Sequence, residues 1–557
     1  MHRIATLDRA RQIALLVGPI AGLTLYLGLA PTGLGHEPRA VAAVAAWMAI
    51  AWMTEAAPLA ATSLLPIVLF PVLGVMSMRD AAAPYAHPLV ALFLGGFILG
   101  SAVERWGLHK RVALATLLTA GTKPSAVIAA FMIATAVLSM FLSNTATTIM
   151  MLPIAVSVIR LVEKRFDEQA AASGEKVKGT PNFAPCLLLA IAYASSVGGV
   201  GAITGTQPNL LLVGFLQERG IEISWAGWLP LGLSLMVVMM PITWLVLTRV
   251  SLPLKVKEIP GGREVIRTEL AALGRISRPE WTTILAFAAV AVGWMTHQPI
   301  EKALAETPLA WLGERLEALG DSGIAMIGAL ALFAIPVGRI DVAPGKSVPK
   351  RAMDWDSAKT LPWDVLLLFG GGLALAGGMK ASGLDVAIGS QLSALKGIPT
   401  WALVAIICSV IVFLTNVTSN TATTAALVPI LGSAADGLGL HPGTLMIPAA
   451  IIASYAFMLP VATPPNAIVF SAGRVSIGQM AFSGLILNVV SVTLVTAVMM
   501  TVGDRLLGMD FSKPLETPSA MGAGEQPSGE TTVDAGIDAD VVAGDAATAL
   551  VEPAVSP

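Results

Sequence analysis

The strongest constraint on the fold of this chain is a six-residue phrase that occurs twice, each time inside a long apolar stretch. Ser143-Asn144-Thr145-Ala146-Thr147-Thr148 recurs letter for letter at residues 419–424. The match continues at one constant spacing, without a gap, from Phe93 to Ile154 in the first copy and from Phe369 to Ile430 in the second. A register held over such a length indicates that a structural unit has been duplicated.

The composition places this duplicated unit in a membrane. The chain has 557 residues, of which 55% are hydrophobic and only 13% are charged, whereas charged residues make up about 25% of an ordinary soluble protein. Apolar stretches of about 20 residues, enough to cross roughly 30 Å of hydrocarbon as a helix, recur along the chain. The near balance of 34 basic and 36 acidic residues gives no support to a nucleic-acid partner. We therefore expect an all-α polytopic membrane protein in contact with membrane lipid.

The apolar stretches and the duplication divide the chain into five segments. We expect a leader with the first span at 1–37, a first repeat at 38–253, a cytoplasmic linker at 254–279, a second repeat at 280–505 and a tail at 506–557. The tail is rich in Ala, Gly, Pro, Ser and acidic residues, and this composition predicts disorder.

Within these segments we expect eleven membrane-crossing helices and two interrupted stretches. The crossings are predicted near 12–30, 38–58, 59–77, 86–106, 183–217, 226–250, 280–297, 320–338, 362–380, 444–472 and 478–505. The interrupted stretches, 124–163 and 399–437, each carry the six-residue phrase near the middle. Each is long enough either for two crossings or for a hairpin that enters the membrane and returns.

The charges of the loops decide between these two possibilities. Lys and Arg concentrate in five segments: the N-terminus, 105–123, 160–182, 249–278 and 339–359. The positive-inside rule places all five in the cytoplasm, so the first interrupted stretch begins and ends on the cytoplasmic side. We therefore predict two re-entrant hairpins, the first opening inward and the second outward, with the N-terminus cytoplasmic and the C-terminus external.

Each repeat then contains an odd number of crossings, so the two repeats run through the membrane in opposite directions. Such inverted-topology repeats are common among secondary transporters, whose binding sites lie near the membrane midplane where broken helices meet. We expect the two phrases to meet there, tip to tip.

Each phrase places Ser, Asn and Thr where a helix begins. The simplest interpretation is that these side chains only cap the helix that follows. The alternative is a binding site, because a helix N-terminus in a low dielectric carries partial positive charge and free N–H donors that suit a carboxylate. The same hydroxyl and amide groups, with backbone carbonyls freed at a break, suit a small hard cation. Two copies on opposed hairpins favour the binding site.

We expect a second interruption in each repeat, at residues 195–201 running into 205–209, and at residues 462–466. Glycine lets the backbone approach a ligand closely, and proline ends a helix and frees carbonyl groups. No predicted span carries a buried Asp, Glu, His or Lys at its centre, whereas proton coupling normally needs such a titratable group. Sodium is therefore favoured over protons as the coupling ion.

The paired Ser-Asn-Thr phrases, the run from Trp52 to Pro58 and the breaks at 205–209 and 462–466 resemble the divalent anion/sodium symporter family of dicarboxylate, citrate and sulfate carriers. The resemblance covers residues 38–505 and implies a homodimer whose transport domains move by an elevator mechanism. The implied sodium ligands are Ser139, Ser143, Asn144 and the Gly205 carbonyl in one site, and Thr415, Asn420 and the carbonyls of Thr418 and Ala462 in the other. The implied substrate-binding residues are Ser143, Asn144, Thr145, Thr206, Ser419, Asn420, Thr421, Thr463 and Pro464.

These observations predict a sodium-coupled symporter of C4-dicarboxylates such as succinate, malate or fumarate in the cytoplasmic (inner) membrane. A sodium-independent dicarboxylate exchanger, or a citrate or sulfate carrier of the same family, stays open as an alternative. A membrane-embedded enzyme is disfavoured because the sequence has no metal-binding His/Glu pattern and no intramembrane Asp pair. Gln207 stands where the second repeat has Pro464, a difference that could tune the choice of substrate.

Overall fold

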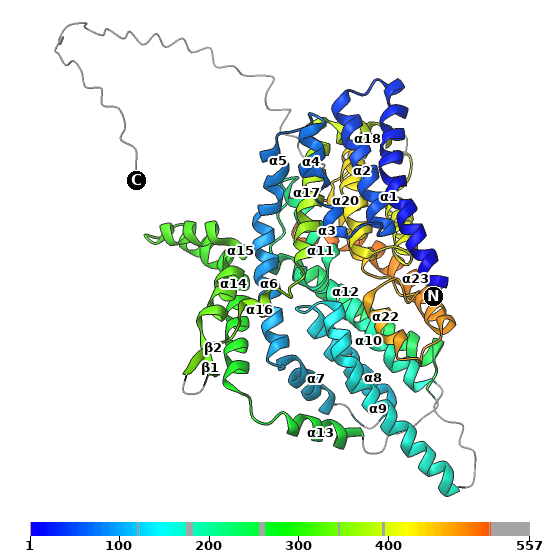
Figure 1. The fold of residues 1–557 in the computed structure, drawn as a ribbon, viewed down its shortest axis with the longest axis vertical. Helices are drawn as coiled ribbons and strands as arrows, with labels where there is room; N and C mark the ends of the chain where they lie inside the picture. Colours follow the sequence, from blue (N-terminus) through cyan, green and yellow to red (C-terminus); the bar gives the residue numbers. More distant parts are fainter. Residues whose placement is uncertain are drawn as a thin grey trace, which may run out of the picture. The chain divides into compact units, whose positions relative to one another are not determined.

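The computed structural model describes residues 2–119, 121, 123–173, 182–254, 262–343, 346–392, 396–511 and 513. Over these ranges the chain is mostly helical, and nine helices are long and apolar enough to cross a membrane (Figure 1). Shorter apolar helical stretches lie between them, at Leu59–Val72, Pro124–Ser139, Thr400–Thr415 and Gly443–Ala453. The chain is therefore a multi-pass membrane protein in which several expected spans are broken helices. The predicted tail beyond residue 513 lies outside the described residues.

The part of the chain before the first hairpin alternates long helices with short helical segments, which are joined by glycine and proline turns. Gly107 follows α6 with a φ of 69°, a left-handed backbone that glycine adopts without steric cost. The bounds are α1 His2–Gly28, η1 Ala30–Thr32, α2 His36–Thr54, α3 Leu59–Thr62, α4 Leu65–Val72, α5 Met78–Ala82, η2 Ala83–Ala86, α6 Pro88–Arg105 and α7 Leu108–Leu118.

The first phrase lies at the tip of a helical hairpin, as predicted. The two arms, α8 and α9, contact each other on either side of the turn at 140–143. The bounds from this hairpin to the linker are α8 Pro124–Ser139, α9 Asn144–Ser173, α10 Phe183–Val200, η3 Ile203–Gly205, α11 Gln207–Gln217, α12 Trp225–Leu245, the π-helical turn η4 Val246–Ser251 and α13 Gly262–Ala272.

The second phrase lies at the tip of a matching hairpin, formed by α19 and α20, which also contact each other. Before it, α15 begins earlier than the predicted crossing at 320–338 and bends at Gly320, where φ is 54°. The bounds are α14 Arg278–Leu304, α15 Ala310–Ala334, α16 Trp355–Ala358, α17 Trp363–Ser382, α18 Leu384–Leu392, α19 Thr400–Thr415, α20 Asn420–Leu438, α21 Gly443–Ala453, α22 Pro464–Ser471, α23 Ile477–Thr501 and α24 Gly503–Leu507.

A two-stranded antiparallel ribbon corrects the expectation of an all-α fold. Strand β1 (Pro336–Ala343) pairs with β2 (Lys346–Arg351), and Ile340 lies opposite Val348. The residues after β2 are held at the end of α6, where the Trp106 Nε1 donates to the Ala352 carbonyl at 2.7 Å and Arg105 pairs with Asp354. Burial opposes ionisation of Asp354, but hydrogen bonds from Arg105 and Ser357 hold the pKa of its carboxyl below the ordinary value.

The two halves of the chain interlock through their hairpins and broken helices. Helix α9 of the first hairpin packs against α22 of the second half, and α20 of the second hairpin packs against α11 of the first half. Within each half the same pairs recur, because α8 and α9 contact α10 just as α19 and α20 contact α21. Each hairpin tip is thereby brought next to the break of the other half.

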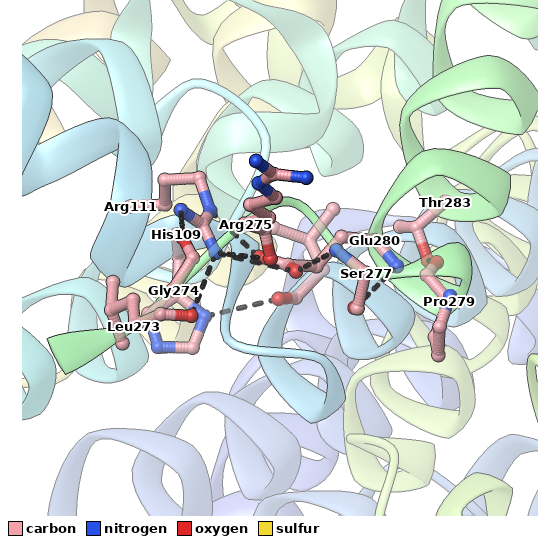
Figure 2. A network of polar contacts seen from close by, with 10 residues as sticks. His109, Arg111, Leu273, Gly274, Arg275, Ser277, Pro279, Glu280 and Thr283 are labelled. Carbon is pink, nitrogen blue, oxygen red and sulfur yellow. Dashed lines mark hydrogen bonds and ion pairs between the residues drawn. The ribbon is translucent and has the colours of Figure 1, made fainter. Parts of the chain in front are cut away.

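A partly buried arginine joins the helix before the first hairpin to the start of the second half (Figure 2). The Arg111 side chain on α7 donates to Glu280 Oε1 at 2.8 Å and to the Gly274 carbonyl at 2.8 Å. Glu280 also accepts from the Ser277 N–H at 2.7 Å, which completes a capping box at the start of α14. The Arg111 and Glu280 side chains are 15% and 8% exposed. The linker end is therefore fixed against α7.

Replacement of Arg111 by alanine should destabilise the protein, because Glu280 and the carbonyls at 273–275 lose their cationic donor. Hydrogen bonds to a charged group contribute about 2 kcal/mol, so the melting temperature of Arg111→Ala in detergent should fall clearly. Lys110→Ala is the control, since Lys110 is the exposed neighbour of Arg111. Equal melting temperatures for the two variants would contradict this role.

Candidate functional site

One cavity of about 760 Å³ lies between the two hairpin tips and the two broken helices. It is lined by twelve of the fourteen residues that the sequence analysis assigns to the site. These are Ser143, Asn144, Thr145, Gly205, Thr206, Thr418, Ser419, Asn420, Thr421, Ala462, Thr463 and Pro464. The remaining two, Ser139 and Thr415, are fully buried directly behind the tips. The structure therefore brings the whole predicted set together.

At the first tip, side chains cap α9 and also tie the turn to α10. The Ser143 hydroxyl accepts from the Ala146 N–H at 3.1 Å, so the capping interpretation holds for this residue. Ser139 donates to Asn144 Oδ1 at 2.6 Å and is 2.8 Å from the Ser195 carbonyl. The amide oxygen of Asn144 therefore points back into the protein, among other oxygen atoms.

The second tip repeats this geometry with one changed side chain. Thr415 donates to Asn420 Oδ1 at 2.6 Å and is 3.0 Å from the Ala453 carbonyl. Ser419 caps α20 by accepting from the Ala422 N–H at 3.5 Å. The change from Ser139 to Thr415 adds a methyl group and keeps the hydroxyl contact to the asparagine of the phrase.

Glycines allow several oxygen atoms to converge behind the first tip. A Cβ atom on Gly205 would lie 2.4 Å from the Gly199 carbonyl oxygen and 2.9 Å from that of Ser139. A Cβ atom on Gly199 would lie 2.6 Å from Asn144 Oδ1. No side chain fits in this space, so carbonyl, amide and hydroxyl oxygens surround it. Neutral oxygens at such close quarters are ligands that suit a hard cation.

The breaks are stabilised by two fully buried asparagines. Asn209 donates from Nδ2 to the Ala202 carbonyl at 2.9 Å, and Asn466 donates from Nδ2 to the Leu459 carbonyl at 3.0 Å. These bonds satisfy carbonyls that a broken helix leaves without intrahelical partners. The predicted break at 195–201 is wrong in its position, because α10 continues to Val200 and the interruption begins only after it.

Four helices begin at the cavity: α9 at Asn144, α11 at Gln207, α20 at Asn420 and α22 at Pro464. The dipoles of all four helices, with the N–H groups in the first turns of α9, α11 and α20, give the cavity a positive field without any basic side chain. Among the described residues that line it, none is Lys or Arg, and Glu55 is the one charged residue. Such convergence of helix N-termini is a site for an anion.

The first tip is also held by a set of aromatic rings that the sequence analysis missed. Phe141, in the turn, lies edge-on to Phe287 of α14 at a centroid distance of 4.9 Å and stacks on Trp225 of α12 at 6.3 Å. Trp225 in turn stacks on Trp294 of α14 at 4.8 Å. The residue that matches Phe141 in the second tip, Val417, is 64% exposed. The two tips therefore have different surroundings in this structure.

Further cavity residues were not assigned to the site from the sequence. Met53 and Thr54 belong to a run that was noticed as a motif, whereas Phe97 and Phe141 carried no local signal; all four line the cavity. Ser454, fully buried, lies 3.4 Å from the Thr206 hydroxyl and joins the two breaks. A contact between such distant segments has no local pattern in the sequence.

The chain is similar to a known family of membrane proteins and to named transporters. A family described as "Sodium:sulfate symporter transmembrane region" matches residues 10–509. The sodium-dependent dicarboxylate transporter SdcS of Staphylococcus saprophyticus is 38% identical over 504 residues, covering 90% of this chain and 93% of that protein. The SdcS of a Staphylococcus aureus strain is 40% identical over the same length and with the same coverage.

Among solved structures, the YdaH transporter of Alcanivorax borkumensis aligns with 75% of this chain and 86% of its own, at a TM-score of 0.49 and 14% identity. The family match and the relatives cover nearly the whole described helical region. The chain therefore belongs to the sodium:sulfate symporter family, the divalent anion/sodium symporters that its paired Ser-Asn-Thr phrases resemble.

Proposed function

We propose that this protein is a secondary active transporter that couples sodium to the uptake of C4-dicarboxylates such as succinate, malate or fumarate across the cytoplasmic membrane. The observation that carries the proposal is the meeting of four helix N-termini at one cavity between the two phrases. The names of the relatives, which are sodium-dependent dicarboxylate transporters, support the same substrate and ion.

The geometry supports a dicarboxylate held between the two tips. One carboxylate would meet Ser143, Asn144 and Thr145, and the other would meet Ser419, Asn420 and Thr421. Thr206, Thr463 and Pro464 would line the space between them. Hydroxyl and amide donors at two opposed helix N-termini can each satisfy one carboxylate, because both contribute N–H or O–H groups and partial positive charge. A substrate with two acidic ends matches this arrangement better than one with a single charge.

The proposed sodium sites would lie directly behind the substrate. The first would use Ser139, Ser143, Asn144 and the Gly205 carbonyl, where Gly199 and Gly205 already approach each other closely. The second would use Thr415, Asn420 and the carbonyls of Thr418 and Ala462. In the described part of the chain no three His, Cys, Asp or Glu residues form a metal-binding group. Neutral oxygens of this kind fit sodium better than a transition metal.

The binding of sodium and of dicarboxylate would be coupled through a side-chain amide, whose oxygen would face the cation and whose N–H groups would face the anion. In Asn144 the Oδ1 atom faces the Ser139 hydroxyl and the nearby backbone oxygens, while Asn144 also lines the cavity. A cation on the oxygen side polarises the amide and strengthens the N–H donors that face a carboxylate. Asn420 has the same arrangement with Thr415. Sodium and dicarboxylate would therefore each favour the binding of the other.

We further propose the membrane arrangement that this function needs. Residues 38–253 and 280–505 would form two inverted repeats, each with five crossings and one re-entrant hairpin, and the leader at 1–37 would supply the eleventh crossing. The linker at 254–279 and the N-terminus would be cytoplasmic, and the tail at 506–557 external. Helix α9 of the first half packs against α22 of the second half, and α20 of the second half packs against α11 of the first half. This reciprocal packing supports a duplicated unit. We also propose that the protein forms a homodimer in the inner membrane. Its site would move across the membrane by an elevator mechanism.

The direct test is uptake of labelled succinate by the purified protein in proteoliposomes. An inward sodium gradient should drive accumulation, and replacement of sodium by potassium or choline should abolish it. Uptake that ignores sodium but requires dicarboxylate inside the vesicle would instead support the exchanger. Accumulation of citrate or sulfate without succinate would support the alternative carriers of this family.

Substitutions of Asn144 separate the cation role from the anion role. Asn144→Ala and Asn420→Ala should each weaken succinate binding about 100-fold, because each loses hydrogen bonds to a charged group. Asn144→Asp keeps an oxygen ligand but repels a carboxylate, so sodium should still raise its melting temperature while succinate no longer does.

The control for these variants is Asn182→Ala, since Asn182 bonds to the Pro253 carbonyl and does not line the cavity. Its uptake should match that of the wild type. Near-normal uptake in either Asn144→Ala or Asn420→Ala would contradict a site shared by the two tips.

A further inference from the structure

The two breaks present different groups to the cavity although their positions match. Helix α22 begins with Pro464 and Pro465, which have no N–H group, and the N–H of Asn466 is capped by Thr463 at 3.2 Å. Helix α11 begins with Gln207, which keeps its backbone N–H, and no side chain caps this helix. Thr206 contacts Ser454 instead, at 3.4 Å. The side of the cavity at α11 is therefore richer in hydrogen-bond donors.

Gln207 adds a side-chain amide to this donor-rich side. The residue is half-buried, lines the cavity and accepts a hydrogen bond from the Thr421 hydroxyl at 3.5 Å through its Oε1 atom. This contact joins the start of α11 to the tip of the second hairpin. Among the described residues the Nε2 group has no hydrogen-bond partner, so both of its N–H donors are available to a ligand.

We propose that Gln207 is a specificity-determining residue that recognises the 2-hydroxyl group of a hydroxydicarboxylate, so that the transporter prefers malate to succinate. This inference rests on the proposed function and deepens it. The contact with Thr421 occupies the amide oxygen of Gln207, which leaves Nε2 to donate to an oxygen atom of the ligand. Both carboxylates are already matched by the two phrases, so a further donor serves a third oxygen on the substrate.

The chemistry of the amide also defines which substituents it disfavours. An ammonium group at the same carbon has only donors, and it would face the N–H groups of Gln207 without an acceptor. A hydrogen atom, as in succinate, leaves a half-buried donor unpaired, which is costly compared with a paired one. A proline at this position, as in the second repeat, offers neither donor. The affinity of the transporter should therefore decrease from malate to succinate and from succinate to aspartate.

Competition experiments in proteoliposomes measure this preference directly. Uptake of labelled succinate is inhibited with unlabelled malate or unlabelled succinate, and the ratio of the two half-inhibitory concentrations is compared between variants. In the wild type malate should be about five- to tenfold more effective than succinate, the difference expected of one neutral hydrogen bond to a partly buried donor. In Gln207→Leu, which has a similar shape without the amide, the ratio should fall to about one.

Gln217→Leu is the matched control, because Gln217 lies at the other end of the same helix and does not line the cavity. It should keep the wild-type ratio. Gln207→Pro copies the residue that the second repeat carries at this position and should also lose the preference. If either Gln207 variant transports too slowly, the ratio is measured from the rise in melting temperature with malate or succinate in saturating sodium.

A wild-type ratio near one, or a ratio that Gln207→Leu leaves unchanged, would overturn the inference. If Gln207→Leu weakened the binding of malate and of succinate equally, the inference would also be overturned, since Gln207 would then contact any dicarboxylate. These results leave the proposed function intact. A wild-type protein that takes up and binds neither acid in sodium would overturn the proposed function together with this inference.

Discussion

The structure depends on one constraint: an anion held inside a membrane protein without basic side chains needs another source of positive charge, which helix N-termini that meet around it can supply. Four helices begin at the cavity, and no Lys or Arg is among its described lining residues. A helix that starts at such a depth requires a broken backbone, and a broken backbone leaves polar groups that must find partners. The hairpin turns, the breaks and the buried Asn209 and Asn466 all follow from this requirement.

The same constraint explains why the two phrases carry neutral side chains. A hydroxyl or an amide can cap a helix, accept a cation on its oxygen and donate to a carboxylate, whereas a basic side chain could only bind the anion. Asn144 and Asn420 each face a buried hydroxyl behind the tip and the cavity in front of it. The halves differ in their surroundings, since Phe141 is stacked on Trp225 while its counterpart Val417 is exposed. A duplicated site is thus built from unequal halves.

Much of the fold and the polar part of the candidate site could be predicted from the sequence, because the duplication marks positions that must be equivalent. The exact repeat of the phrase located both hairpin tips, and the paired breaks located Gly205, Thr206 and residues 462–464 of the cavity lining. Glycine in an apolar stretch was ambiguous, because it is compatible both with a break in a helix and with close packing between helices. Gly198 and Gly199 suggested a break, but α10 is helical there, and a Cβ atom on Gly198 would lie 2.4 Å from Ala136 Cα. These glycines permit close packing between helices, which only the tertiary structure reveals.

Other features could not be predicted because they join distant segments. The bond from Arg111 to Glu280 and the rings around Phe141 have no local pattern in the sequence. The β-ribbon at 336–351 is short, and the apolar helical stretches on both sides of it dominate the sequence pattern.

The most direct test of the account is an experimental structure of the protein with sodium and succinate bound. The account predicts succinate in the cavity, in contact with both Ser143–Thr145 and Ser419–Thr421, and sodium ions beside Asn144 and Asn420. Succinate held by one tip alone, or bound outside this cavity, would contradict it.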